Sequence, residues 1–111
     1  MTTMREVRRL ALALPEAVEQ DHHGMASFRV RSKIYATVPD ERHVRIMVAE
    51  PEVLAALAED PASCRPLHWG KRLAGVEVTV RTASAQLVGG LLADAWYRRA
   101  PAALRRELDS P

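Results

Sequence analysis

Arginine occupies alternate positions in the stretch SFRVR, residues 27–31. Phe28 and Val30 alternate there with Arg29 and Arg31, which is the period of a β-strand with one buried face and one exposed face. A guanidinium group stays charged at any ordinary pH and can donate two parallel hydrogen bonds to a phosphate. The pattern therefore favours binding of an anion, and a merely solvated strand face is the alternative interpretation.

Further basic residues have the same outward position or lie in turns beside it. Arg45 alternates with Val44 and Ile46, and Arg81 follows Val80 in the stretch VEVTVR. A face of this kind can follow a nucleic-acid backbone by contacting its phosphates. The candidate nucleic-acid-binding residues are Arg29, Arg31, Lys33, Arg45, Lys71, Arg72 and Arg81.

The turn after Val30 decides which of these side chains share a face. A two-residue turn at Arg31 and Ser32 places Ile34 on one face of the sheet, and a three-residue turn places it on the other. The sequence is compatible with both turns, so the extent of the basic face stays open.

The stretch Asp21-His22-His23 is the pattern most similar to a metal site. Adjacent residues of an extended chain point to opposite sides, so neighbouring histidines seldom bind one ion. A catalytic zinc site needs three protein ligands, and His43 and His68 are distant in the sequence. We therefore expect loop histidines that are exposed or hydrogen-bonded, and we expect neither a metal nor another cofactor.

Motifs of common enzyme classes are absent from the sequence. It contains no Gly-x-Ser-x-Gly elbow, no phosphate-binding loop and no dinucleotide-binding fingerprint. The acidic residues cluster at helix starts and turns, where they suit capping better than acid–base catalysis. Cys64 has no accompanying pattern that supplies a base, which is typical of a buried structural cysteine. We expect a protein that is not an enzyme.

The chain contains two tryptophans in different settings. Trp96 continues the apolar helical spacing of Leu91 and Leu92, which predicts a core position. Trp69 stands between His68 and Gly70 in a segment expected to be a loop. The usual burial of indoles favours a core position for Trp69 as well, and stacking on a partner is the alternative.

Length and composition indicate a single cytoplasmic domain over residues 1–111. The chain has 111 residues, one cysteine and a formal net charge of +2. A single cysteine excludes an intramolecular disulfide and suits a reducing compartment. No long apolar run follows the N-terminal arginines, and no segment is long enough to span a bilayer. A net charge this small does not by itself indicate nucleic-acid binding.

The hydrophobic spacing predicts an α+β fold in two layers, with an antiparallel meander packed against helices. Capping residues mark helix starts at Thr3 and Ser84, the acid-proline-acid sequence marks one at Glu50, and prolines mark helix ends near Pro15 and Pro61. Strands are expected at 27–31, 33–38, 43–48 and 76–81. The predicted order is α-β-β-β-α-β-α, with extra short strands near residues 18 and 66, an otherwise irregular segment before residue 76, and a short final helix at AALRREL.

The chain resembles the MmcQ/YjbR-like proteins in five stretches that occur in the same order. They are ALALPEAVE, SFRVRSKIYATV, EPE, PLHWGKR and LLADAWYRRAPAAL, and together they span nearly the whole domain. The chain departs from the family's pattern at two positions. Ser32 stands where the turn usually has glycine, and LAGV stands where a tryptophan usually precedes the last strand, so that Leu73 or Val76 would fill its core space.

The resemblance implies an α+β fold similar to that of type III secretion chaperones. It also implies DNA binding, because family members are described as DNA-binding proteins by analogy to a double-wing arrangement in which an exposed sheet is the contact surface. It implies no catalytic residues. The basic residues inside the matching stretches are Arg29, Arg31, Lys33, Lys71 and Arg72.

The favoured hypothesis is therefore a protein that contacts the DNA phosphate backbone through a basic sheet face. The alternative is a module without catalytic activity that binds a protein or peptide, by strand addition or in an apolar groove. The roles of His22, His23 and Trp69 and the oligomeric state stay open at the level of sequence.

Overall fold

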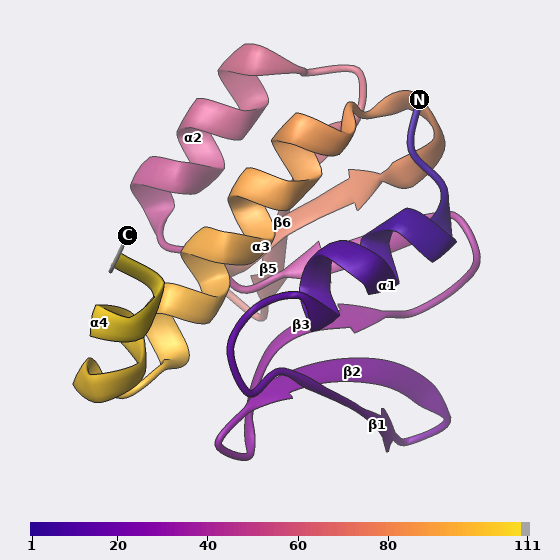
Figure 1. The fold of residues 1–111 in the computed structure, drawn as a ribbon. Coiled ribbons are helices and arrows are strands. Elements are labelled where there is room, and N and C mark those ends of the chain that lie inside the picture. The colour runs from indigo at the N-terminus through magenta and orange to yellow at the C-terminus, as the bar shows by residue number, and fades with distance from the viewer. Residues whose placement is uncertain (110–111) are drawn as a thin grey trace.

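The structure is a computed structural model that describes residues 1–109, and its elements are shown in Figure 1. They are α1 (Met4–Leu12), β1 (Val18–His22), β2 (Met25–Val30), β3 (Lys33–Val38), β4 (His43–Ile46), α2 (Glu50–Glu59), β5 (Cys64–Trp69), β6 (Arg72–Thr79), the 3-10 helix η1 (Val80–Thr82), α3 (Ala85–Arg99) and α4 (Ala102–Asp109). The predicted α+β class and element order are confirmed. The extra strands expected near residues 18 and 66 are β1 and β5, and the final helix is α4.

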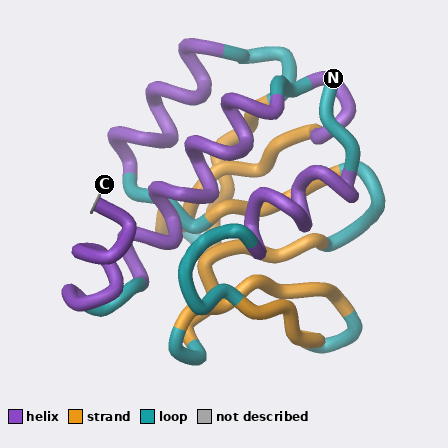
Figure 2. Tube along the Cα trace, in the orientation of Figure 1, coloured by secondary structure: helices purple, strands orange, loops and turns teal. Residues whose placement is uncertain are grey.

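The strands form one antiparallel sheet in the order β1-β2-β3-β4-β6-β5. Figures 1 and 2 show α1, α2 and α3 on the same face of this sheet, with α3 between the other two, and α4 at a corner of the molecule. Side chains alternate along a strand, so those that do not face these helices point to the opposite face. We name this the open face.

Local capping interactions begin the helices where the sequence predicts. The Thr3 hydroxyl accepts a hydrogen bond from the Glu6 amide at 3.1 Å, and the Thr3 amide donates to the Glu6 carboxylate at 3.3 Å. The Ser84 hydroxyl accepts from the Leu87 amide at 3.0 Å at the start of α3. Helix α2 has no side-chain cap, but Pro51 lies in its first turn, where the missing amide proton costs no hydrogen bond.

The turn between β2 and β3 sets the register of the first pairs in this hairpin, up to a shift between Phe28 and Arg29. Val30 pairs with Lys33, so Arg31 and Ser32 alone connect the two strands. Their φ angles are 50° and 69°, and positive values at both positions define a type I′ turn. The two-residue alternative is therefore correct, and it places Ile34 opposite Arg29.

The segment before residue 76, expected to be mostly irregular, is largely a β5–β6 hairpin. The prediction underestimated β5 because Pro66 and Gly70 weaken a strand signal. Both are tolerated here, because β5 is an edge strand and Gly70 lies in the turn with a φ of 63°. Strand β6 requires Gly75, since a Cβ there would collide with the main-chain oxygen of Ile46 in β4.

The core lies between the sheet and the helices, and its largest members are Trp96, Tyr35 and Phe28. The predicted core position of Trp96 is confirmed. Its indole N–H donates to the main-chain oxygen of Pro15 at 2.9 Å, and the Tyr35 hydroxyl donates to that of Ala11 at 2.9 Å. These bonds satisfy the polar ends of two buried rings.

Candidate nucleic-acid interface

Arg29 and Arg45 lie on the open face, as strand alternation predicts. Their strand neighbours Phe28, Val44 and Ile46 are fully buried in the core, whereas both arginines are partly exposed. Because the sheet pairs β2 with β3 and β3 with β4, the two guanidinium groups occupy neighbouring parts of one surface.

A groove with a volume of about 620 Å³ crosses this surface, and we name it the basic groove. Its residues come from the β1–β2 hairpin, β3, β4, the end of β5 and the end of α3. They are His22, Met25, Arg29, Ser32, Lys33, Ile34, Thr37, Arg45, Met47, Trp69 and Arg99. No aspartate or glutamate within residues 1–109 is among them, so the charged side chains of this lining favour anions.

The cations of the groove differ in how far their charge is balanced. Arg29 donates from Nε to the Ser27 hydroxyl at 3.1 Å, and this neutral partner leaves its charge uncompensated. Arg45 donates from Nε to the Glu77 carboxylate at 3.0 Å, so part of its charge is balanced. Lys33 is exposed at the start of β3. Arg29 and Lys33 are therefore better placed than Arg45 to bind an added anion.

Arg99 reaches the groove from the C-terminal end of α3. Its Nε atom is buried and has no hydrogen-bond partner among the described residues. Burial, followed by the nearby charges of Arg98 and Arg72, lowers the pKa of Arg99. An anion bound beside the Arg99 guanidinium would offset the repulsion from these neighbouring charges.

A second recess, with a volume of about 370 Å³, shares Lys33 and Arg99 with the basic groove. Its other lining residues are Arg31, Arg98, Ala100, Pro101, Ala102 and Arg105. Arg98 and Arg105 donate to main-chain oxygens at 3.1 and 2.7 Å, which hold their side chains without balancing their charge. Basic residues thus continue from the groove to the junction of α3 and α4.

Sequence reasoning did not single out Arg98, Arg99 or Arg105. Arginines at the C-terminal end of a helix commonly interact with the helix dipole, so their pattern is ambiguous. The available signal was their density in YRRAPAALRREL, where arginine pairs flank a helix break.

Arg31 does not share the outward position of Arg29. Strand β2 ends at Val30 and the chain turns at Arg31, so the expected alternation stops one residue early. The Arg31 guanidinium donates to both carboxylate oxygens of Glu16, at 2.7 and 3.0 Å. This hydrogen bonding lowers the pKa of Glu16 and balances part of the arginine's charge.

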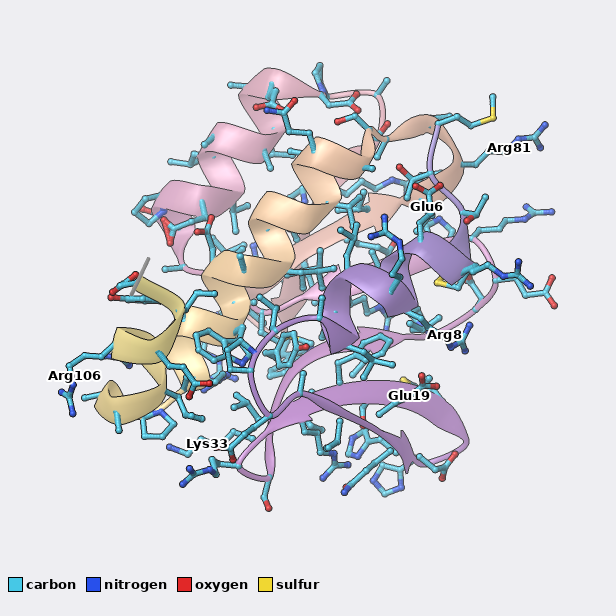
Figure 3. All side chains as sticks on the ribbon, in the orientation of Figure 1. Glu6, Arg8, Glu19, Lys33, Arg81 and Arg106 are labelled. Atoms are coloured by element: carbon cyan, nitrogen blue, oxygen red, sulfur yellow. The ribbon has the colours of Figure 1, made fainter. Side chains whose placement is uncertain are left out.

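Arg81 lies apart from the other candidates. Strand β6 ends at Thr79 and Arg81 belongs to η1, so its expected outward strand position is wrong. The 3-10 helix η1 begins at Val80, whose amide donates a hydrogen bond to the main-chain oxygen of Arg42 at 2.9 Å. Figure 3 shows Arg81 and Lys33 on opposite sides of the molecule, and Arg81 lines neither basic recess.

Trp69 lines the basic groove and is 50% exposed, so its expected core position is wrong. It is the last residue of the edge strand β5, where it faces the groove instead of the core. The Arg72 guanidinium carbon lies 5.3 Å from the centroid of the indole, a cation–π contact. Lys71 is exposed in the turn between them, so Lys71 and Arg72 add charge beside the groove.

His22 lines the groove, whereas His23 is exposed in the β1–β2 turn with a φ of 54°. Within residues 1–109, no group of three or more histidine, cysteine or acidic side chains is placed to hold a metal ion. Cys64 is buried, as predicted. In the part of the chain that the structure describes, no helix is both long enough and apolar enough to cross a membrane.

Comparison with known proteins supports the fold assignment. The family model described as YjbR matches residues 12–98. The crystal structure of Deinococcus radiodurans protein DR2400, which has the domain DUF419, is similar to the chain with a TM-score of 0.75. The two chains are 24% identical, and the match covers 100% of this chain and 91% of that chain. At this identity the likeness shows the fold alone. A search of curated proteins found no match.

Proposed function

The chain belongs to the YjbR family, and we propose that it binds nucleic acid by contacting the phosphate backbone through the basic groove. One observation carries the proposal. Arg29, Lys33 and Arg99 come from three different elements and line the same groove, without a lining carboxylate in residues 1–109. Convergent cations of this kind match a polyanion, and phosphate contacts supply most non-specific affinity for nucleic acid. DNA is the form that the family resemblance suggests.

The groove is suited to holding a backbone more than to reading base sequence. Strand residues line most of it, and α1, α2 and α3 pack on the opposite face of the sheet (Figure 1). A recognition helix that presents several side chains to a major groove is therefore not part of the proposed contact. Backbone contacts position a protein without specifying a sequence, so we expect weak sequence preference.

Charge reversal tests the proposal. Arg29→Glu and Lys33→Glu should each weaken binding to labelled DNA roughly tenfold and reduce the dependence of affinity on salt. Fluorescence anisotropy at several salt concentrations measures both quantities, and circular dichroism checks that each variant is folded.

Arg81→Glu is the matched control for this experiment. It makes the same charge change as the groove variants, but Figure 3 shows Arg81 on the side of the molecule opposite Lys33, and Arg81 does not line the groove. We expect Arg81→Glu to bind nearly as well as the wild type. Equal weakening by all three substitutions would show that only net charge matters, and a wild type that binds no DNA at low salt would overturn the proposal.

The second candidate function is peptide binding, and the exposed edge strand β1 favours it. β1 is exposed along nearly its whole length and has β2 as its one neighbour in the described sheet. A peptide could add there as a further strand through main-chain hydrogen bonds. Such binding would be insensitive to salt and to Arg29→Glu. For both candidates, lack of catalysis and a cytoplasmic location stay predictions.

A further inference from the structure

Trp69 gives the basic groove an aromatic surface that phosphate binding alone does not need. The indole is 50% exposed, whereas Trp96 is fully buried. Arg72 lies over the Trp69 ring at 5.3 Å and adds a positive charge beside it. Aromatic rings flanked by cations are typical platforms for nucleobases, because every base has a flat face that can stack.

Apolar side chains in the same groove extend this surface. Met25, Ile34 and Met47 line it together with Trp69. The volume of about 620 Å³ lies in the range of sites that enclose small organic groups, which is roughly 300–1,000 Å³. The groove therefore has room and contact surface for a base in addition to a phosphate.

Two cations connect the basic groove with the adjoining recess. Lys33 and Arg99 line both the basic groove and the adjoining recess, so they stand at the boundary between the two. The positive charge of Arg99 therefore faces both the groove and the recess. Arg98 and Arg105 line the rest of the adjoining recess and add further positive charge there.

We propose that the basic groove binds single-stranded nucleic acid in preference to duplex, with an unpaired base stacked on Trp69 and adjoining phosphates held by Lys33 and Arg99. The bases of a duplex are paired and stacked on one another, so none of them can enter a recess without being extruded. An unpaired base can enter the groove without being extruded from a duplex. This inference rests on the proposed function and specifies the form of nucleic acid that the same site takes.

Intrinsic fluorescence tests the inference without any label or substitution. Trp96 is fully buried and hydrogen-bonded to Pro15, so quenching by a base reports on Trp69. The probes are oligo(dT), an oligo(dA)·oligo(dT) duplex and an abasic deoxyribose-phosphate strand, all of equal length, and free thymidine monophosphate. We expect oligo(dT) to quench and to bind roughly tenfold more tightly than the other three.

Substitutions separate stacking from charge. Trp69→Ala should lower the affinity for oligo(dT) roughly tenfold and leave the affinity for the abasic strand unchanged. Trp69→Phe keeps an aromatic ring and should retain most of the affinity. Leu54→Ala is the matched control, because it removes an exposed apolar side chain from α2, which does not line the groove.

The results with the four probes distinguish failure of the single-strand inference from failure of the proposed function. Duplex binding as tight as strand binding, without quenching, would overturn the single-strand inference and leave the proposed function standing. Free nucleotide binding as tight as strand binding would overturn it in favour of a small-ligand site. If none of the four probes binds at low salt, both proposals fail.

Discussion

Cys64 begins β5 and is 3% exposed. Burial, followed by the carboxylates of Asp60 and Glu59, raises the pKa of its thiol to about 11 from an ordinary value of 9.0. The thiolate is the nucleophilic form of cysteine, and the folded protein disfavours it. These surroundings fit a small structural side chain and oppose a catalytic one.

The free energy of unfolding should fall as the pH rises from about 9 to about 11. In that interval the unfolded chain has lost the Cys64 proton while the folded chain still holds it, so raising the pH favours the unfolded state. The stabilisation is complete below the unfolded pKa and is lost as the pH passes through the folded one. Urea unfolding at a series of pH values measures the decline.

Cys64→Ala is the control for this pH profile, since it should remove the part of the decline that begins near pH 9. Burial also raises the pKa of the Tyr35 phenol above its ordinary 10.0, so a further decline at higher pH should persist in the variant. An identical profile in the variant and the wild type would mean that the Cys64 thiol does not contribute.

The two tryptophans show which residue positions could be predicted from the sequence. Trp96 continues an apolar helical spacing, and that local pattern was enough to predict its burial. The exposure of Trp69 depends on which side of the sheet the end of β5 presents it to, and that follows from the β5–β6 pairing rather than from any local pattern. The same holds for Arg99, whose place in the groove depends on where α3 ends relative to the sheet.

At the scale of elements, the β2–β3 turn carries strain that a substitution can remove. Ser32 has a φ of 69° at the turn position where glycine is strongly preferred. A left-handed conformation costs a non-glycine residue roughly 1–2 kcal/mol, of which the greater flexibility of unfolded glycine offsets part. Ser32→Gly should therefore raise the free energy of unfolding by about 0.5–1 kcal/mol. Urea unfolding measures the change.

Ala55→Gly supplies the contrast for the turn variant. Ala55 is exposed within α2, where glycine should lower the free energy of unfolding by about 1 kcal/mol. Opposite signs in the two variants would confirm that backbone geometry governs the effect. Destabilisation by Ser32→Gly would show that the hydroxyl makes a stabilising contact.

Helix starts could be predicted at this scale because their signals are local. The Thr3 capping box and the Ser84 cap lie within three residues of the amides that they bind. The register of β2 and β3 could not be predicted from the sequence, because it depended on a choice between turns of different length. Once the type I′ turn is known, Ile34 pairs with Arg29 across the hairpin, and Arg31 lies in the turn instead of continuing the alternation of β2.

At the scale of the molecule, charge is segregated in a way that the net charge of +2 conceals. The basic groove and its adjoining recess lie where the open face meets the end of α3. A different hollow, between α2 and α3 in the helix layer, is lined by Glu52, Glu59 and Asp94. Burial, followed by the charge of Glu52, raises the pKa of Asp94 there. The two hollows thus differ in the sign of their lining charges, and a polyanion is attracted to the basic groove rather than to the acidic hollow.

Carboxylates next to the groove should limit its affinity for nucleic acid, and Glu77 tests this. Glu77 accepts a hydrogen bond from Arg45 at 3.0 Å, so Glu77→Gln frees a cation inside the groove. Each additional phosphate contact on a single strand steepens the plot of log affinity against log salt by about 0.7. We therefore expect tighter binding and a slope steeper by about that amount, measured by anisotropy with labelled oligo(dT).

Glu41→Gln separates this local effect from net charge. It also removes one negative charge, but Glu41 is exposed before β4 and lines neither basic recess. If only the total charge mattered, both glutamine variants would steepen the slope equally, and Arg45 would have no direct role. A steeper slope in Glu77→Gln alone would place a phosphate at Arg45. It would also mean that, in the wild type, the ion pair with Glu77 prevents Arg45 from binding a phosphate.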